Sequence, residues 1–179
     1  MNRPRPTPTG RERTFRAQEI IVSKTDLAGK ITYANDVFVR VSGYAERDLL
    51  GSPHSIIRHP EMPRAVFRLL WDTLREGREV FAYVNNLAAN GDHYWVLAHV
   101  TPSLGAAGEV VGYHSSRRVP GRHAVAAVEG IYDRLRREEL RHGDTLAGLA
   151  ASTAMLRGVL GDAGVDYPEF VFSLTVGDG

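Results

Sequence analysis

The chain has 179 residues and 43% of them are hydrophobic, which is enough for one domain with its own core and an appended segment. Its formal net charge of +1 indicates no general attraction to nucleic acid or to an anionic membrane surface. The sequence contains no cysteine, which excludes disulfides, thiolate metal sites and a covalent cysteinyl link to a cofactor.

The first 18 residues differ in composition from the rest of the chain. They are rich in Arg, Pro and Thr and lack the apolar core of a signal peptide. No apolar run elsewhere approaches the roughly 20 residues that a membrane span requires. We therefore expect residues 1–18 to be a disordered or flexible tail on a cytoplasmic protein without a membrane span.

The next part of the chain predicts a strand hairpin followed by short helices. Residues 19–23 and 31–34 are apolar enough for strands, and the turn between them, residues 26–30, contains a glycine. Asn35 and Asp36 can cap a helix over residues 37–41. A second short helix is expected over residues 46–50, where Gly51 provides a C-terminal stop.

The central stretch, residues 56–95, contains an unusual group of charged and aromatic side chains. It opens with Arg58-His59-Pro60-Glu61-Met62-Pro63, and proline favours the first turn of a helix. Pro60 or Pro63 therefore starts the predicted helix that carries Trp71. Free N–H groups beside Arg58 and His59 would suit an anion or an electron-rich ring edge, although an ordinary surface loop is the alternative.

Three further strands are predicted after this helix. Residues 81–87, 93–101 and 109–117 have strand character, and the turn Asn90-Gly91-Asp92 joins the first two. Because strand side chains alternate, Asn86 lies on the same face as Ala82 and Val84. The fold class is therefore α+β, with a five-stranded antiparallel sheet and short helices on one face.

A helical extension is predicted over residues 120–179. Apolar residues from Val125 to Leu135 recur at helical spacing, and those from Leu146 to Leu160 form a second helix. The two stripes could support a homodimer or could cover each other within one chain. Residues 167–176 are largely apolar, with Phe170, Phe172 and Leu174 at alternating positions, which predicts an extended apolar tail.

Two histidines are predicted to lie opposite each other in the sheet. A loop centred between residues 106 and 107 places His99 across from His114, on the face of Trp95 and Leu97. On the inner face such a pair could relay a proton to a bound ligand. On the outer face it would lie under the C-terminal helices or at a dimer contact.

Four segments together resemble the PAS sensor domains of the bacterial aerotaxis receptor type. They are residues 31–36, 41–44, 58–63 and 90–95, and the last two are the more specific. The resemblance covers residues 19–119 and implies a PAS fold that binds FAD non-covalently and senses the redox state. Two departures are Val80 and Phe81 at the usual place of a tryptophan, and Leu87-Ala88-Ala89 in place of a basic run.

The resemblance also implies which residues contact the cofactor. Flavin requires apolar walls and amide groups that both donate and accept hydrogen bonds. Without the resemblance, Trp71 would be read as an ordinary core tryptophan and Asn86 as a surface amide near a turn. The expected cofactor-binding residues are Arg58, His59, Glu61, Trp71, Asn86, Asn35 and Ile57.

Two alternatives to flavin remain open from the residues. Some PAS domains bind haem b, and His54, His59, His99 and His114 could supply an axial imidazole. A cofactor-free interaction module that only dimerises is the second alternative.

No catalytic function is expected, because the sequence shows no nucleophile beside a base, no paired metal-binding histidines and no phosphate-binding glycine loop. The family's membrane anchor and signalling modules are absent from these 179 residues. We therefore expect a stand-alone sensor that signals in trans to a chemotaxis receptor or a kinase.

Overall fold

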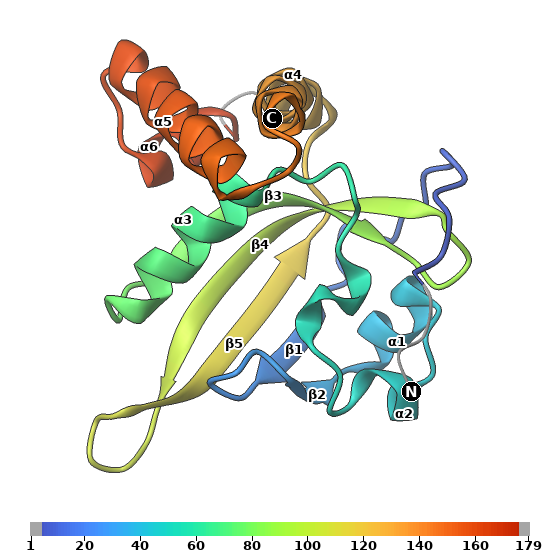
Figure 1. Ribbon diagram of the computed structural model, residues 1–179. Coiled ribbons are helices and arrows are strands. Elements are labelled where there is room, and N and C mark those ends of the chain that lie inside the picture. The colour runs from blue at the N-terminus through green and yellow to red at the C-terminus, as the bar shows by residue number, and fades with distance from the viewer. Residues whose placement is uncertain (1–4, 176–179) are drawn as a thin grey trace.

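A twisted five-stranded antiparallel sheet forms the centre of the protein (Figure 1). The computed structural model describes residues 5–175, and the strand order is β2-β1-β5-β4-β3. The strands are β1 Ile21–Thr25, β2 Ile31–Ala34, β3 Val80–Leu87, β4 His93–Leu104 and β5 Val110–Arg118. The helices are α1 Asp36–Ser42, α2 Glu46–Leu49, α3 Arg64–Arg75, α4 Arg122–Arg141, α5 Leu146–Ala163 and α6 Tyr167–Ser173, and His54–Ile57 forms a 3₁₀ turn. The α+β prediction is confirmed.

Local signals in the sequence account for the first hairpin and the helix after it. The Asp26 carboxylate accepts a hydrogen bond from the Lys30 N–H at 2.8 Å, and Gly29 supplies the positive φ that ends the turn. Asn35 caps α1, as predicted, by accepting from the Phe38 N–H at 3.0 Å. The chain then crosses the inner face of the sheet and returns as β3 at the opposite edge.

The sequence predicts that Pro60 or Pro63 is the first residue of helix α3, but the helix begins one residue after Pro63. Pro63 is the N-cap, with φ −65° and ψ 141°, and Arg64 is the first helical residue. The helix buries Ala65, Val66, Leu70 and Leu74 on one face, with the apolar spacing that the sequence predicts. It lies along the inner face of the sheet, where α1 and α2 also lie (Figure 1).

The register of β4 and β5 differs from the prediction. His99 pairs with Ser116, and His114 pairs with Thr101. The loop is centred on residue 107, because Leu104 pairs with Val110, and an irregularity between Ser103 and Leu104 shifts the strands by one further residue. Equal counting from the loop midpoint fails whenever one strand carries an extra residue. The two histidines are therefore diagonal neighbours and not a directly opposed pair.

Both of these histidines lie on the outer face of the sheet. His99 stacks on Phe81 at 4.1 Å between ring centroids and lies 2.7 Å from the Glu79 carboxylate. Phe81 in turn contacts Phe172 of α6. This position excludes the proposed proton relay into the interior and leaves His99 beside the C-terminal extension.

The C-terminal extension packs around β3, the strand at one edge of the sheet. Tyr132 of α4 donates to the Tyr83 carbonyl at 2.8 Å, and α6 contacts the outer face of β3. Helix α5 packs on α3, on the inner side (Figure 1). The apolar stripe of α4 is buried within the chain, where Val128 and Leu135 have almost no exposed surface.

The predicted extended tail is wrong within the described residues, because Tyr167–Ser173 form helix α6. Asp166 and Glu169 make a capping box: the Glu169 N–H donates to Asp166, and the Asp166 N–H donates to Glu169, each at 2.9 Å. Pro168 in the first turn also favours a helix. These start signals outweigh the alternation of Phe170, Phe172 and Leu174. Val176 lies outside the described residues.

Part of the N-terminal segment also differs from a free tail. The Thr9 N–H donates to Gly91 at 2.8 Å, and the Arg13 N–H donates to His93 at 2.7 Å. The Asp92 carboxylate accepts from the Thr9 hydroxyl at 2.7 Å and pairs with Arg13. These bonds hold the segment along the β3–β4 turn. Residues 1–4 of the predicted tail lie outside the described part of the chain.

Candidate functional site

A cavity of about 480 Å³ lies between α3 and the inner face of the sheet. The 3₁₀ turn closes one side of it, and Leu149 of α5 contributes to the wall near α3. Its lining combines apolar and aromatic side chains, such as Leu70, Leu74 and Val84, with polar and basic ones, and enclosed pockets of this mixed kind are typical sites for organic ligands. The lining residues used below are Ser23, Thr25, His54, Ile57, Arg58, Arg64, Phe67, Arg68, Trp71, Asn86, Tyr113, Ser115 and Arg117.

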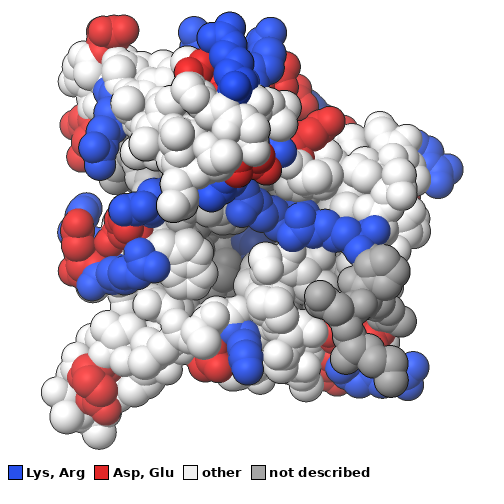
Figure 2. Space-filling model, viewed as in Figure 1, with Lys and Arg blue, Asp and Glu red and all other residues white. Residues whose placement is uncertain are grey.

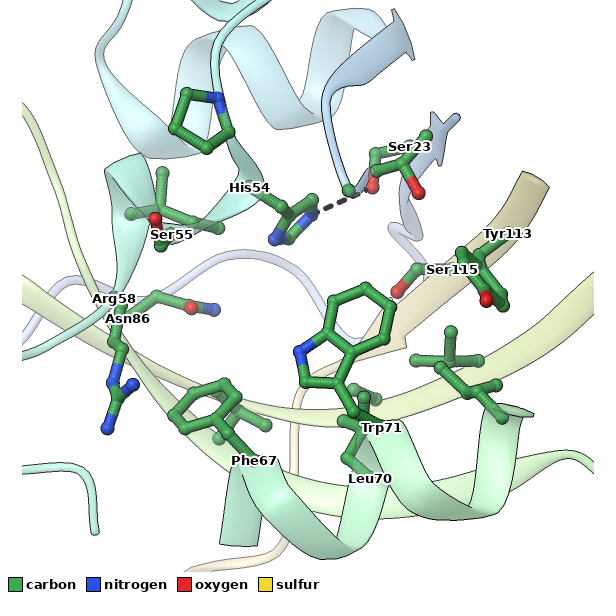
Figure 3. A pocket seen from close by; sticks show the side chains of 18 of the residues that line it. Ser23, His54, Ser55, Arg58, Phe67, Leu70, Trp71, Asn86, Tyr113 and Ser115 are labelled. Atoms are coloured by element: carbon green, nitrogen blue, oxygen red, sulfur yellow. Dashed lines mark hydrogen bonds between the residues drawn. The ribbon is translucent and has the colours of Figure 1, made fainter. Parts of the chain in front are cut away.

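Aromatic side chains from α3 project into this cavity. Trp71 and Phe67 lie one helical turn apart, and Figure 3 shows both rings pointing away from α3 into the open space. The Trp71 ring meets Tyr113 of β5 edge to face, with 5.4 Å between centroids. The indole therefore presents a flat apolar surface to the cavity.

Asn86 points from β3 toward the same space (Figure 3). Its side chain is buried, and among residues 5–175 its Nδ2 has no hydrogen-bond partner. A buried amide donor without a partner costs roughly 1–3 kcal/mol, so this group is suited to a ligand acceptor. The Asn86 backbone also forms an antiparallel bridge with Arg58, which fixes the position of both residues.

Basic residues line the opening of the cavity. Figure 2 shows Lys and Arg side chains along a hollow in this face of the molecule, and the cavity wall includes Arg58, Arg64 and Arg68. The Arg58 guanidinium donates to the Met62 carbonyl at 3.0 Å and lies 4.1 Å above the Phe67 ring. Burial lowers the pKa of Arg58 to about 10, so it is still charged at neutral pH.

Arg117 is a cavity residue that the sequence reasoning missed. It lies on β5, alternating with Ser115 and Tyr113, and is only 2% exposed. Its Nη2 donates to the Ser23 hydroxyl, and burial lowers the pKa of the guanidinium to about 10. The spacing of Tyr113, Ser115 and Arg117 could have predicted this, because every second residue of a strand lies on the same face. All three lie on the inner face, which lines the cavity.

His54 faces the inner end of the cavity beside Ser23. Its Nε2 lies 3.1 Å from the Ser23 hydroxyl, as the dashed line in Figure 3 marks. Burial, followed by the charge of Arg117, lowers the pKa of His54 to about 3. Of the four histidines considered as haem ligands, it alone belongs to the cavity lining, and the nitrogen at Nε2 is already engaged.

The state of His54 predicts how stability depends on pH. Since the folded pKa is about 3 and the unfolded value about 6.5, the unfolded chain takes up this proton first as the pH falls. Stability from neutral His54 is therefore complete above pH 6.5 and is lost between that pH and 3. From pH 7 to 5 the wild type should lose about 2 kcal/mol more than His54→Gln, as measured by urea unfolding.

The matched control is His142→Gln, which removes an exposed histidine from the end of α4. Because it retains His54, its loss of stability from pH 7 to 5 should exceed that of His54→Gln. If His54→Gln follows the wild type, then His54 accepts a proton in the folded protein and the assignment is wrong.

Three of the predicted cofactor residues lie outside the cavity lining. The Asn35 side chain is hydrogen-bonded to the protein backbone: it accepts from the Val22 N–H at 3.0 Å and donates to the Ile20 carbonyl at 2.9 Å. His59 is buried at 6.0 Å from the His93 ring, with its pKa lowered by burial, and Glu61 is largely exposed. The structure brings the other four together in the wall: Ile57, Arg58, Trp71 and Asn86.

The sheet order and the helices on its inner face define a fold of the PAS class. Residues 31–117 match the model of the PAS fold family, so the chain carries a PAS domain. The chain is 45% identical over 115 residues to the aerotaxis receptor of Escherichia coli strain K12, a match that covers 64% of this chain and 22% of that protein.

Other relatives agree with this family assignment. The nitrogen fixation regulatory protein of Klebsiella pneumoniae is 31% identical over 99 residues, 55% of this chain and 20% of that protein. A light-oxygen-voltage domain studied with a flavin analogue superposes with a TM-score of 0.54 and 21% identity, over 62% of this chain and 84% of its own, which supports the fold alone. The chain matches about a fifth of the length of the curated relatives.

Proposed function

We propose that this protein is a sensor whose PAS domain binds FAD non-covalently and signals the redox or oxygen state to a partner protein. The observation that carries the proposal is a cavity with aromatic walls and unpartnered buried donors, in a chain 45% identical to an aerotaxis receptor over the matched region. Bound FAD would supply a ring whose charge and hydrogen bonding change on reduction.

The residues present fit a flavin ring. Such a ring has two apolar faces and one polar edge with both donors and acceptors. Trp71 and Phe67 offer apolar surface to the faces, and Asn86 offers a buried amide with a free donor to the edge. Since the sequence contains no cysteine, these contacts would hold the ring without a thiol link.

The charged opening supports FAD in particular. Arg58, Arg64 and Arg68 belong to the cavity wall, and no carboxylate side chain does so among residues 5–175. Guanidinium groups bind phosphate oxygens well because their planar donors match two oxygens at once. Arg64 also pairs with Asp144 and Arg68 with Asp72, so a ligand with two phosphates outside the ring pocket would compete with these carboxylates for the guanidinium groups.

The alternatives receive less support from the geometry. Haem b would require an imidazole with a free nitrogen, whereas the Nε2 of His54 faces Ser23 and the other histidines considered lie outside the cavity lining. A cofactor-free interaction module would not require a buried donor without a partner at Asn86.

We further propose that the output is protein–protein contact in trans, to a chemotaxis receptor or kinase, from a non-enzymatic homodimer in the cytoplasm. Helix α3 supplies Trp71 to the cavity and packs against α5, so a change at the ligand could alter the C-terminal extension. No helix within residues 5–175 is long and apolar enough to cross a membrane. Light scattering should give about twice the chain mass of 19.7 kDa, and a monomer mass alone would contradict the dimer.

An absorption spectrum of the purified protein tests the cofactor. Flavin bands are expected in the wild type, and mass spectrometry of the released cofactor should identify FAD. Asn86→Ala should weaken FAD binding by about tenfold, because one buried hydrogen bond is lost. Titration of the cofactor-free protein with FAD, followed by flavin fluorescence, measures this.

Asn85→Ala is the matched control, because Asn85 precedes Asn86 on β3 and points to the outer face, opposite Trp95. It should bind FAD as the wild type does. Equal affinities for all three proteins would contradict the role of Asn86, whereas a haem spectrum or no cofactor at all would contradict the flavin assignment.

A further inference from the structure

Arg117 is a buried cation with little to neutralise it. Its side chain is 2% exposed, and its Nη2 donates to the Ser23 hydroxyl. Within the described part of the chain, its Nε and Nη1 are buried without any partner. The guanidinium carbon lies 4.5 Å from the centre of the Phe38 ring, which is a favourable contact but provides no negative charge.

Two ionisable side chains that interact with Arg117, His54 and Tyr94, are both neutral. His54, on the 3₁₀ turn, has its pKa lowered to about 3 and is uncharged at neutral pH. Tyr94, on β4, is fully buried, and burial raises the pKa of its phenol, so it keeps its proton. The cavity lining adds Arg58, Arg64 and Arg68 but no Asp or Glu from residues 5–175.

Such a cation destabilises the protein while the cavity holds no ligand charge. A buried, unpaired charge loses its hydration and gains no ion pair in return. Folded proteins therefore rarely contain such a charge. Desolvation lowers the pKa of Arg117 only to about 10, so the side chain stays charged at neutral pH. A methionine of similar length would fill the same space without this cost.

We propose that Arg117 serves to bind negative charge on the inner part of the cavity ligand. This rests on the proposed function: for FAD, the charge is that of the ring after it takes up two electrons and one proton, which leaves one negative charge. The electrons and the proton come from an external reductant and from solvent. Arg117 would therefore make the cavity bind reduced FAD more tightly, relative to oxidised FAD, than a neutral side chain would.

The first arm of the test measures this preference in the full chain. Dissociation constants for oxidised FAD and for dithionite-reduced FAD are determined for the wild type, Arg117→Met, Arg117→Lys and Arg118→Met. Arg117→Met should lower the preference for reduced FAD by about tenfold or more, because a charge-assisted hydrogen bond is lost. Arg117→Lys should retain part of it. Arg118, the exposed next residue on β5, is the matched control and should leave it unchanged.

The second arm needs no flavin and measures thermal unfolding of the cofactor-free proteins. Arg117→Met should raise Tm by about 4 °C or more, because the uncompensated charge is gone, while Arg118→Met should not. A lower Tm for Arg117→Met would show that the guanidinium is structural and would overturn the proposal, as would an unchanged redox preference. If the wild type binds no FAD, the proposed function fails, and a raised Tm still supports Arg117 as the site of another anionic ligand.

Discussion

Replacing Glu139 by alanine should lower the free energy of unfolding by about 3 kcal/mol. Glu139 lies on α4, and its carboxylate has no exposed surface. One oxygen accepts from the Ala65 N–H at 3.1 Å and from the Ser152 hydroxyl at 3.0 Å. The other accepts from Arg136 at 3.2 Å. Three helices therefore meet at one buried charge.

The expected loss follows from what the substitution leaves behind. The Ala65 N–H belongs to the first turn of α3, where helices have N–H groups without internal partners and where negative charge is favourable. Alanine would leave that donor buried and unpaired. It would also remove the anion beside Arg136, which is partly buried and still pairs with Asp144. Helix α3 would lose part of its support from the C-terminal extension.

Urea unfolding of three variants tests this prediction. Glu139→Gln keeps an acceptor for Ala65 and Ser152 and should cost about 1 kcal/mol. Glu129→Ala, at an exposed position on the same helix, should stay within about 0.5 kcal/mol of the wild type. If Glu139→Ala is as stable as Glu129→Ala, the carboxylate does not hold α3, α4 and α5 together.

The second large effect is expected at Tyr132, where α4 packs on the outer face of the sheet. Tyr132→Ala should cost about 4 kcal/mol, since a buried aromatic side chain is lost and a cavity remains. The ring lies 6.2 Å from Trp95, and its hydroxyl donates to the Tyr83 carbonyl at 2.8 Å. That bond satisfies a carbonyl on β3, a strand at the edge of the sheet.

Two substitutions separate the hydrogen bond from the packing. Tyr132→Phe keeps the ring and should cost about 1 kcal/mol, the usual value of one such bond. Tyr33→Ala, at a 46% exposed position on β2, should have little effect. Unfolding followed by tryptophan fluorescence reports directly, because Trp95 contacts Tyr132. A loss for Tyr132→Ala no larger than for Tyr33→Ala would mean that α4 is not an integral part of the folded core.

Much of the candidate site could be predicted from the sequence. Alternation along β3 correctly places Asn86 with Ala82 and Val84, and α3 carries Trp71 into the cavity. The first inference needs only the two-residue period of a strand, and the second only the helical period. Both also use the motifs that resemble the aerotaxis receptor type. For Asn35, His59 and Glu61 the same motifs give no spatial information, and the structure places these residues outside the cavity lining.

The failures share a cause, which is competition between signals. In Tyr167–Ser173 a capping box and a proline compete with an alternating pattern, and only the packing of α6 on β3 shows which conformation is stable. For His99 and His114, the true centre of the loop and one irregularity in the β4–β5 hairpin each shift the pairing by one residue, and the loop sequence reveals neither.

The sequence by itself determined the strands and α-helices of residues 19–119, which side chains share a strand face, and the α+β class, because these depend on local spacing and caps. Only the tertiary structure decided that Arg117 and His54 share one cavity and that Glu139 is buried between three helices. A charged side chain on the surface has little effect on stability, whereas a buried one has a large effect. Whether a charged residue is buried depends on segments distant in the chain, because these exclude water from it and provide its hydrogen-bond partners.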